Sequence, residues 1–394
     1  MRTPRKPSPS TRSTGPRQVA LIVETSNAYA RNLLQGIVHY GREHAPWSLF
    51  LVEQSRGQSA PEWVANWQGD GIIARIENQQ VADAVLASGL PAVDLSAGRF
   101  APSLPFIETD DQQIARLAFD HLAERGFTHF AFCGDERFNW SRERGKAFKK
   151  LVRGRRGVMH PLPADLQDED VSRQISLLEK WVTALPKPIG VFACYDIRGQ
   201  QLLDACRNCS IAVPEEVAVI GVDDDDLLCQ LAYPPLSSVQ PNARLTGYEA
   251  AALLAEMMDG ESREGVEKRI PPIDVTARQS TDILAIDDGL VVRAMRYIRE
   301  HACDPITVRD LLGVVSVSRR ILEQRFERAV GHSPHAEIVA TRINRVKQLL
   351  LETDLSLETI AARTGFEHPE YLTVMFKREV GEPPGRFRRQ VLSG

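Results

Sequence analysis

The chain has 394 residues, of which 43% are hydrophobic and 25% are charged, so it can bury more than one core and lacks the composition of a disordered or fibrous protein. It has no apolar run near the ~18 residues that a membrane span needs and no apolar stretch before residue 17, which predicts a protein that is neither membrane-bound nor exported. The net charge of −4 is unevenly spread, because residues 1–17 and 289–394 are basic and the region between them is acidic. We therefore expect only the two ends to meet polyanions.

Residues 1–17 are rich in Pro, Ser, Thr and Arg and have no periodicity, which predicts a disordered basic arm. Basic termini are common, so a solvated tail without a role is the favoured interpretation.

Residues 18–283 alternate short apolar runs with amphipathic stretches. The runs with the length and composition of strands are 19–24, 48–52, 71–76, 91–95, 129–134, 189–196 and 217–223. Between them, apolar residues recur at helical spacing, as at Ala30, Leu33, Leu34 and Ile37. Repeated strand–helix units predict an α/β fold with parallel sheets and helices on both faces, and the length of the region predicts two similar lobes.

Near residue 285 the pattern becomes helical and stays so. We predict a linker at 284–289 and an all-α domain at 290–391 with two helix-turn-helix units. In the first unit, Thr307 and Asp310 have the spacing of a capping box, and Ser318 can cap a second helix. In the second unit, Ser356 can cap a helix that ends at Gly365, and a further helix follows.

Pro369 suits the first turn of that further helix, and residues 341–352 are predicted to form a helix that connects the two units. In such a unit the second helix enters the ~12 Å major groove of DNA, with its first residues facing base edges. The candidates for base contacts are Arg319, Arg320 and Gln324 in the first unit and His368, Glu370 and Thr373 in the second. Lys377 and Arg378 are better placed for phosphates.

One unit alone could be a generic helical bundle, but two in tandem favour a DNA-binding domain. Residues 290–390 resemble the arabinose-regulator (AraC/XylS) family of transcription factors in the stretches SRRILEQRFERAVGHSP (318–334) and LSLETIAARTGFEHPEYLTVMFKREVGEPPGRFR (355–388). The resemblance implies sequence-specific binding to double-stranded promoter DNA, an RNA polymerase partner and a buried core that includes Ile360, Leu372 and Phe376.

In the α/β region, acids follow predicted strands, with Asp196 at the end of one run and Asp223 at the end of another. Ligands of open α/β folds bind beyond the carboxyl ends of strands, and carboxylates and guanidinium groups there can hold sugar hydroxyls. A strand-end Asp can equally cap a helix. Residues 18–283 resemble the lac-repressor and periplasmic sugar-binding fold in IETDDQQIARLAFDHLAERGFTHFAFCG (107–134), RGKAF (144–148) and VIGVDDDDLL (219–228).

This resemblance implies that Arg144, Asp196 and Asp223 contact ligand hydroxyls, and residues 27–31 are a further candidate segment. The α/β region followed by the helix-turn-helix domain resembles the arrangement in the family of xylose operon regulators, with shared stretches such as AYxR (28–31) and RYIREHAC (296–303). That family implies a cytoplasmic homodimer that activates transcription in response to xylose or a similar monosaccharide. Arg75 stands where the family has an acid, so another pentose or a hexose stays open.

Two other functions compete with this one. An enzyme is disfavoured because the chain lacks G-x-x-x-x-G-K-[ST], G-x-S-x-G, H-E-x-x-H and a dinucleotide-type glycine run. The acids at 223–226 could bind magnesium, but such runs are more often solvated or capping. Cys206 and Cys209 lack the further ligands that zinc needs, so we expect no metal and no cofactor. A DNA-architectural protein, whose α/β region only dimerises, would show no response to sugars.

Overall fold

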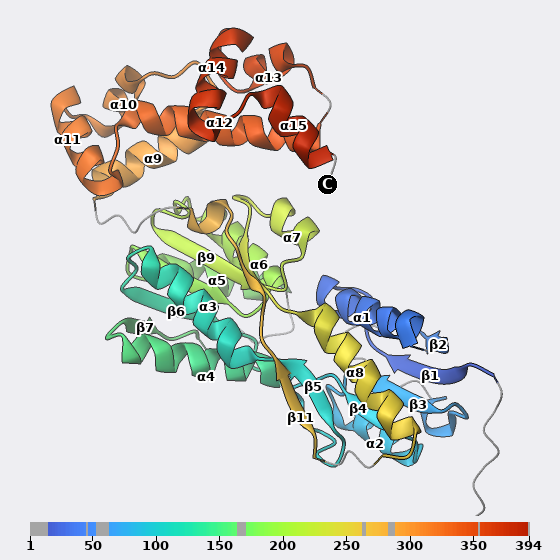
Figure 1. Cartoon of the computed structure of the whole chain (residues 1–394). Helices are drawn as coiled ribbons and strands as arrows, with labels where there is room; N and C mark the ends of the chain where they lie inside the picture. Colours follow the sequence, from blue (N-terminus) through green and yellow to red (C-terminus); the bar gives the residue numbers. More distant parts are fainter. Residues whose placement is uncertain are drawn as a thin grey trace, which may run out of the picture.

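The computed structural model describes residues 15–44, 46–52, 63–163, 171–261, 265–282, 288–353 and 355–392. Two lobes, each built on a twisted sheet, are followed by an all-helical C-terminal domain (Figure 1). Among the described helices, none combines the length and the apolar character that crossing a bilayer requires. The predicted fold class is confirmed.

The first sheet defines the N-terminal lobe, and its strands lie in the order β11-β5-β4-β3-β1-β2. These strands are β1 (Arg17–Ile22), β2 (Trp47–Leu51), β3 (Gly71–Ala74), β4 (Ala92–Asp94), β5 (Phe106–Thr109) and β11 (Glu267–Ile270). All of their pairings are parallel. The lobe also contains α1 (Ala28–His44), the short helix η1 (Val64–Asn66), α2 (Gln79–Ala87) and α8 (Ala243–Met258).

Alternate residues of the central strands β1, β3 and β4 enter different cores, as the two-residue period of a strand requires. Val19 and Leu21 of β1 pack in a core with α1 and α8, whereas Ala20 and Ile22 pack in a second core with α2. Helices α1 and α8 cross at two glycines. A Cβ on Gly36 would lie 2.0 Å from the carbonyl oxygen of Arg244, and a Cβ on Gly247 would lie 2.0 Å from that of Leu33, so only glycine permits this crossing.

The second sheet defines the C-terminal lobe, with the order β12-β10-β9-β8-β6-β7. Its strands are β6 (His129–Cys133), β7 (Val158–His160), β8 (Ile189–Ala193), β9 (Val217–Val222), β10 (Ser237–Gln240) and β12 (Asp274–Thr276). Only β12 runs antiparallel to its neighbour among the described pairs. The helices are α3 (Asp111–Glu124), α4 (Asn139–Gly154), α5 (Val171–Ala184), α6 (Asp196–Asn208), α7 (Asp226–Leu231) and the short η3 (Gln279–Thr281). Cores lie on both faces of the sheet, one with α3 and α4 and the other with α5 and α6.

The chain passes between the lobes three times. It leaves the N-terminal lobe after β5, returns between β10 and α8, and leaves again between β11 and β12. In Figure 1 the narrow waist between the lobes is formed by these crossings. Neither lobe is therefore a continuous segment of the sequence.

The C-terminal domain consists of helices packed around two cores. The helices are α9 (Gly289–His301), α10 (Val308–Val315), α11 (Arg319–Val330), α12 (Pro334–Glu352), α13 (Leu357–Arg363), α14 (Pro369–Val380) and α15 (Pro384–Leu392). One core joins α9, α10, α11 and the start of α12, and the other joins the rest of α12 to α13 and α14. Two helix-turn-helix units are thus built at opposite ends of α12 (Figure 1).

The sequence signals for these helix ends are confirmed. Thr307 and Asp310 form a capping box, and Ser318 and Ser356 each accept a hydrogen bond from a backbone amide of the first turn. Gly365 has a φ of +72°, and Pro369 occupies the first turn of α14. The connecting helix, however, begins at Pro334 rather than at residue 341, because Ser333 caps it and Pro334 starts it.

Candidate functional site

A cavity lies between the two lobes at the carboxyl ends of their strands. Its walls come from both lobes and consist of Tyr29, Arg75, Leu95, Ser96, Ala97, Glu108, Thr109, Asp111, Trp140, Arg144 and Asp223. Two of the three residues predicted to bind ligand, Arg144 and Asp223, line it.

Arg144 is fixed in the wall of the cavity by two contacts. Its Nε donates to Oδ1 of Asp111 at 2.7 Å, and its Nη1 donates to the carbonyl oxygen of Cys194 at 2.6 Å. The guanidinium lies 4.9 Å from the centre of the Trp140 ring. Burial raises the pKa of Asp111 to about 6, although Arg144 opposes the shift. The arrangement presents donors, a carboxylate and an aromatic face to whatever fills the cavity.

Arg75, the residue at which the sequence departs from the family it resembles, lines the cavity from the N-terminal lobe. It is 8% exposed and forms ion pairs with Glu24 and Glu77, the latter at 2.7 Å between Nη2 and Oε1. Its guanidinium lies 5.2 Å from the centre of the Tyr29 ring. Burial alone would lower the pKa of Arg75, but Glu24 and Glu77 raise it above the usual value. The cation is therefore held permanently charged with its own counterions.

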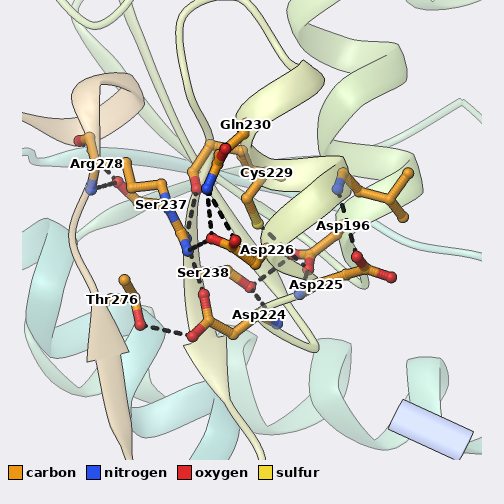
Figure 2. Close-up of polar contacts among 12 residues, drawn as sticks. Asp196, Asp224, Asp225, Asp226, Cys229, Gln230, Ser237, Ser238, Thr276 and Arg278 are labelled. Atoms are coloured by element: carbon orange, nitrogen blue, oxygen red, sulfur yellow. Dashed lines mark hydrogen bonds and ion pairs between the residues drawn. The ribbon is translucent and has the colours of Figure 1, made fainter. Parts of the chain in front are cut away.

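Asp196 lies beside the cavity wall but is not part of its lining. Its carboxylate accepts hydrogen bonds from the Asp225 amide at 2.9 Å and from the Ser238 hydroxyl at 2.6 Å, and Cys229 Sγ lies 3.5 Å away (Figure 2). Burial and the neighbouring Asp223 raise its pKa well above the ordinary value. Contact between Asp196 and a ligand stays a prediction; the observed bonds fix the turn that carries Asp223.

The other acids of the run 223–226 have separate local roles. Asp225 caps α7, and Asp224 accepts a hydrogen bond from the hydroxyl of Thr276 at 2.7 Å. Arg278 Nη1 lies 2.8 Å from Asp224 Oδ1 (Figure 2). Asp226 is exposed and accepts from the side chain of Gln230. These contacts match the capping interpretation of the run.

The lobes touch across the mouth of the cleft. The side-chain amide of Asn139 donates to the carbonyl oxygen of Ala97 at 2.6 Å, and Arg31 Nη2 lies 3.7 Å from Asp225 Oδ2. Of the candidate segment 27–31, Tyr29 lines the cavity, whereas Asn27 accepts a hydrogen bond from the amide of Ala30 and starts α1. The structure therefore shows a closed cleft.

Sequence reasoning missed several lining residues. Glu108, Thr109 and Asp111 follow or end β5, a strand with no strong apolar run, although they lie inside the stretch 107–134 that carried the family resemblance. Glu24 gave no signal of its own, because only the folded chain brings it to Arg75, whereas Glu77 is two residues from Arg75 in the sequence and was overlooked.

The second helix of each helix-turn-helix unit presents all of its predicted contact residues except Thr373 to solvent. Arg319, Arg320 and Gln324 are exposed on α11, and Arg319 also pairs with Glu323 one turn later. In the second unit His368 is the N-cap of α14, and the exposed residues are His368, Glu370, Lys377 and Arg378. Thr373 is half-buried, and its hydroxyl donates to the carbonyl oxygen of Pro369 at 2.8 Å. Base and phosphate contacts by these residues stay predictions.

Apolar side chains also stand exposed on these helices. Ile321 is 44% exposed, Tyr371 49% and Val374 63%, while Ile360, Leu372 and Phe376 are fully buried. Ile321 and Tyr371 therefore lie on the outer face of their helices, away from the core. Apolar groups at such positions can contact thymine methyl groups.

Comparison with known proteins supports both halves. Models of three families match: a XylR N-terminal domain at 18–112, a periplasmic binding protein-like domain at 119–281 and a helix-turn-helix domain at 311–390. The xylose operon regulatory protein of Escherichia coli K12 is 33% identical over 381 residues, covering 94% of this chain and 96% of that protein. This chain belongs to the xylose operon regulator family. The Haemophilus influenzae family member is 32% identical over 380 residues, with 94% and 98% covered.

Solved structures agree with this family assignment. A structure described as the xylose-binding transcription activator xylR matches with a TM-score of 0.82 and 32% identity, covering 95% of this chain and 98% of that one. A periplasmic binding protein/LacI regulator from Alkaliphilus metalliredigens QYMF, in complex with D-xylulofuranose, matches with a TM-score of 0.56 at 20% identity and shows the fold of the two lobes alone. As a family member, the chain is a sugar-responsive regulator of transcription with a DNA-binding domain and is not an enzyme.

Proposed function

We propose that this regulator binds a neutral monosaccharide, xylose or a close relative, in the cavity between the lobes, and that the bound sugar changes how its C-terminal domain binds promoter DNA. The proposal is carried by the polar groups that converge on the cavity from both lobes: the buried pair of Arg144 with Asp111, the half-buried Asp223, and the buried Arg75 with its two glutamates. A ligand that bridges these groups stabilises the closed cleft, which is how an effector shifts a two-state equilibrium.

The charges around the cavity favour a neutral ligand. Arg75 and Arg144 are each balanced by carboxylates, and Glu108 is itself balanced by Arg99 and Arg269. Asp223 is a further acid in the lining. A carboxylate on the ligand would be repelled by these groups, whereas hydroxyls can donate to the acids and accept from the guanidinium groups. Trp140 offers an aromatic face for the C–H groups of a sugar ring.

The names of the relatives point to xylose, since the matched relatives are xylose operon regulators and one solved structure is described as xylose-binding. A different pentose or a hexose is the second candidate. The Arg75 guanidinium stays charged and can only donate hydrogen bonds, so it discriminates between sugars by the positions of their hydroxyl oxygens. The experiment is a thermal-shift panel of xylose, arabinose, ribose, glucose and galactose. A ligand at 100 times its Kd should add about 2.7 kcal/mol to the free energy of unfolding.

Xylonate, which carries a carboxylate on the same carbon skeleton, serves as the matched control and should give no shift. DNA sites would be selected from a random duplex library with the chain itself, and their affinity would be measured with and without the active sugar. Asp223→Ala should abolish the sugar effect and keep the DNA affinity measured without sugar. Identical DNA binding with every sugar would contradict the proposal and favour an architectural role.

We propose further that the chain acts as a homodimer and an activator that contacts RNA polymerase. Three apolar side chains at and after α7 are strongly exposed, namely Leu227 at 67%, Leu231 at 63% and Tyr233 at 61%. An apolar surface of this kind fits a second copy, and paired helix-turn-helix domains read paired half-sites. Light scattering of the wild type and of Leu231→Glu tests the dimer, and transcription in vitro with purified polymerase tests activation.

A further inference from the structure

The C-terminal domain rests on the C-terminal lobe through a loop between α6 and β9. Ala212 in this loop is 5% exposed and packs in the same core as Leu290, Val291 and Met295 of α9. Two glutamates at the end of the loop face two arginines of α9. Glu216 Oε2 lies 2.7 Å from Arg296 Nη2, and Glu215 Oε1 lies 2.7 Å from Arg299 Nε.

These ion pairs differ in burial. The Glu215 side chain is fully buried, and burial raises the pKa of its carboxyl, while Arg299 opposes that shift. A buried carboxylate is costly unless a cation accompanies it, so the Arg299 charge makes the buried position of Glu215 tenable. The Glu216 carboxylate is 28% exposed and also accepts a hydrogen bond from the Ala212 amide at 2.7 Å, which holds the loop in the shape that reaches α9.

Strand β9 links this contact to the sugar cavity. It starts directly after Glu216, is buried along all six residues, and is followed directly by Asp223, which lines the cavity. Six residues of strand span about 20 Å. The Ile189 amide donates to the Glu216 carbonyl oxygen at 2.9 Å, so the loop is bonded to the sheet of the C-terminal lobe.

On the other side, α9 is joined to the first reading helix. Asp288, the N-cap of α9, lies 2.6 Å from the Nε of Arg325 on α11, and Leu322 and Phe326 of α11 share the core of α9. A displacement of α9 therefore displaces α11 with it, because packed cores move as units rather than deform.

We infer that the pairs Glu215–Arg299 and Glu216–Arg296 form a clamp that makes the C-terminal lobe and the DNA-binding domain one body, so that movement of this lobe on sugar binding is delivered to the reading helices. This inference rests on the proposed sugar response but concerns a different surface, about one strand length away from the cavity.

The test uses the full chain with a donor fluorophore on α4 and an acceptor on α10, attached through non-canonical side chains so that the native cysteines stay unlabelled. Arg296→Glu places like charges opposite one another and should lower energy transfer between the probes. The double variant Glu216→Arg with Arg296→Glu should restore most of it. Arg293→Glu makes the same charge change at an exposed position of the same helix and should leave it unchanged.

In the same variants, the ratio of DNA affinities with and without sugar is measured. Arg296→Glu should reduce that ratio at least about fivefold while sugar affinity stays at the wild-type value. Arg299→Gln removes the charge of Arg299 and so tests the buried ion pair independently. If both Arg296→Glu and Arg299→Gln showed the same energy transfer as the wild type, the clamp would be overturned. The same conclusion would follow if energy transfer were lost while the effect of sugar on DNA affinity stayed intact. If the wild type showed the energy transfer expected of the clamp but its DNA affinity did not respond to sugar, the proposed function would be overturned instead.

Discussion

The guanidinium of Arg144 and the carboxylate of Asp111 lie 2.7 Å apart in the cavity wall, and each side chain is less than one-tenth exposed. Asp111→Asn keeps the size of the side chain but removes the charge that balances Arg144. We expect sugar affinity to fall at least about tenfold, or about 1.4 kcal/mol, because Arg144 loses the partner that orients it. Calorimetric titration with the active sugar measures this change.

Glu143→Gln provides the control for that variant, since Glu143 lies on α4 next to Arg144 in sequence but pairs with Lys146 at the surface. Its sugar affinity should match the wild type. Equal affinities in Asp111→Asn and the wild type would remove the Arg144–Asp111 pair from the binding site.

The crossing of α1 and α8 predicts a large effect of one methyl group. Gly36→Ala should destabilise the N-terminal lobe by about 1–3 kcal/mol or more, because its Cβ would overlap a backbone carbonyl that cannot move aside. Gly41→Ala on the same helix meets only the Cβ of Trp47 at 4.0 Å and should be neutral or stabilising by about 0.5–1 kcal/mol. Urea unfolding of both variants compares the two effects, and similar stabilities would contradict the close crossing.

His121 predicts a loss of stability in mild acid. It is buried, with its Nε2 2.7 Å from the hydroxyl of Thr281, and burial together with Arg125 lowers its pKa to about 4. In the unfolded chain the pKa is near 6.5, so the unfolded state takes up a proton first as the pH falls. This group alone should reduce the free energy of unfolding by about 2 kcal/mol between pH 7.5 and pH 5.

His121→Gln keeps a hydrogen-bonding side chain and removes the titration. Urea unfolding at the two pH values should therefore show a smaller loss for the variant than for the wild type. An equal loss in both proteins would assign the acid sensitivity to other groups.

The DNA-binding residues predict two distinct kinds of defect. Arg320→Ala should weaken binding by about 1–3 kcal/mol at one base position and relax selection there, because an exposed Arg at the start of α11 is placed for guanine. Arg378→Ala should weaken binding evenly across sequences and reduce the salt dependence, as loss of a phosphate contact does. Binding to a set of single-base operator variants at two salt concentrations separates the two patterns, and a uniform loss for Arg320→Ala would reassign it to the backbone.

Much of the fold could be predicted from sequence because buried central strands leave continuous apolar runs. All seven predicted strands are present, as β1, β2, β3, β4, β6, β8 and β9. The strands that the sequence did not predict are short or lie at the edges of the sheets, where burial is partial. In β11 (Glu267–Ile270), for example, only Ile270 is buried. The helix ends of the C-terminal domain were predictable because capping residues act over three or four positions.

The candidate site was predictable only in part. Arg144 and Asp223 line the cavity as expected, but Asp196, which follows its strand in the same way, has its carboxylate bonded to Asp225 and Ser238 instead. Both positions look alike in the sequence, and only the folded arrangement around α7 determines which acid lines the cavity. The pairing of Arg75 with Glu24 joins residues 51 positions apart in the sequence and has no local signature.

The threefold passage between the lobes has a consequence for biosynthesis. The core of the N-terminal lobe includes Leu254 of α8 and Ile270 of β11 as well as residues of β1 and α1. The first hundred residues therefore leave the ribosome without the helix and edge strand that complete their core. At translation rates of about 5–20 residues per second, they wait roughly 10–30 s for those segments. During that interval the nascent lobe exposes the apolar face that α8 will cover, which makes it a substrate for chaperones.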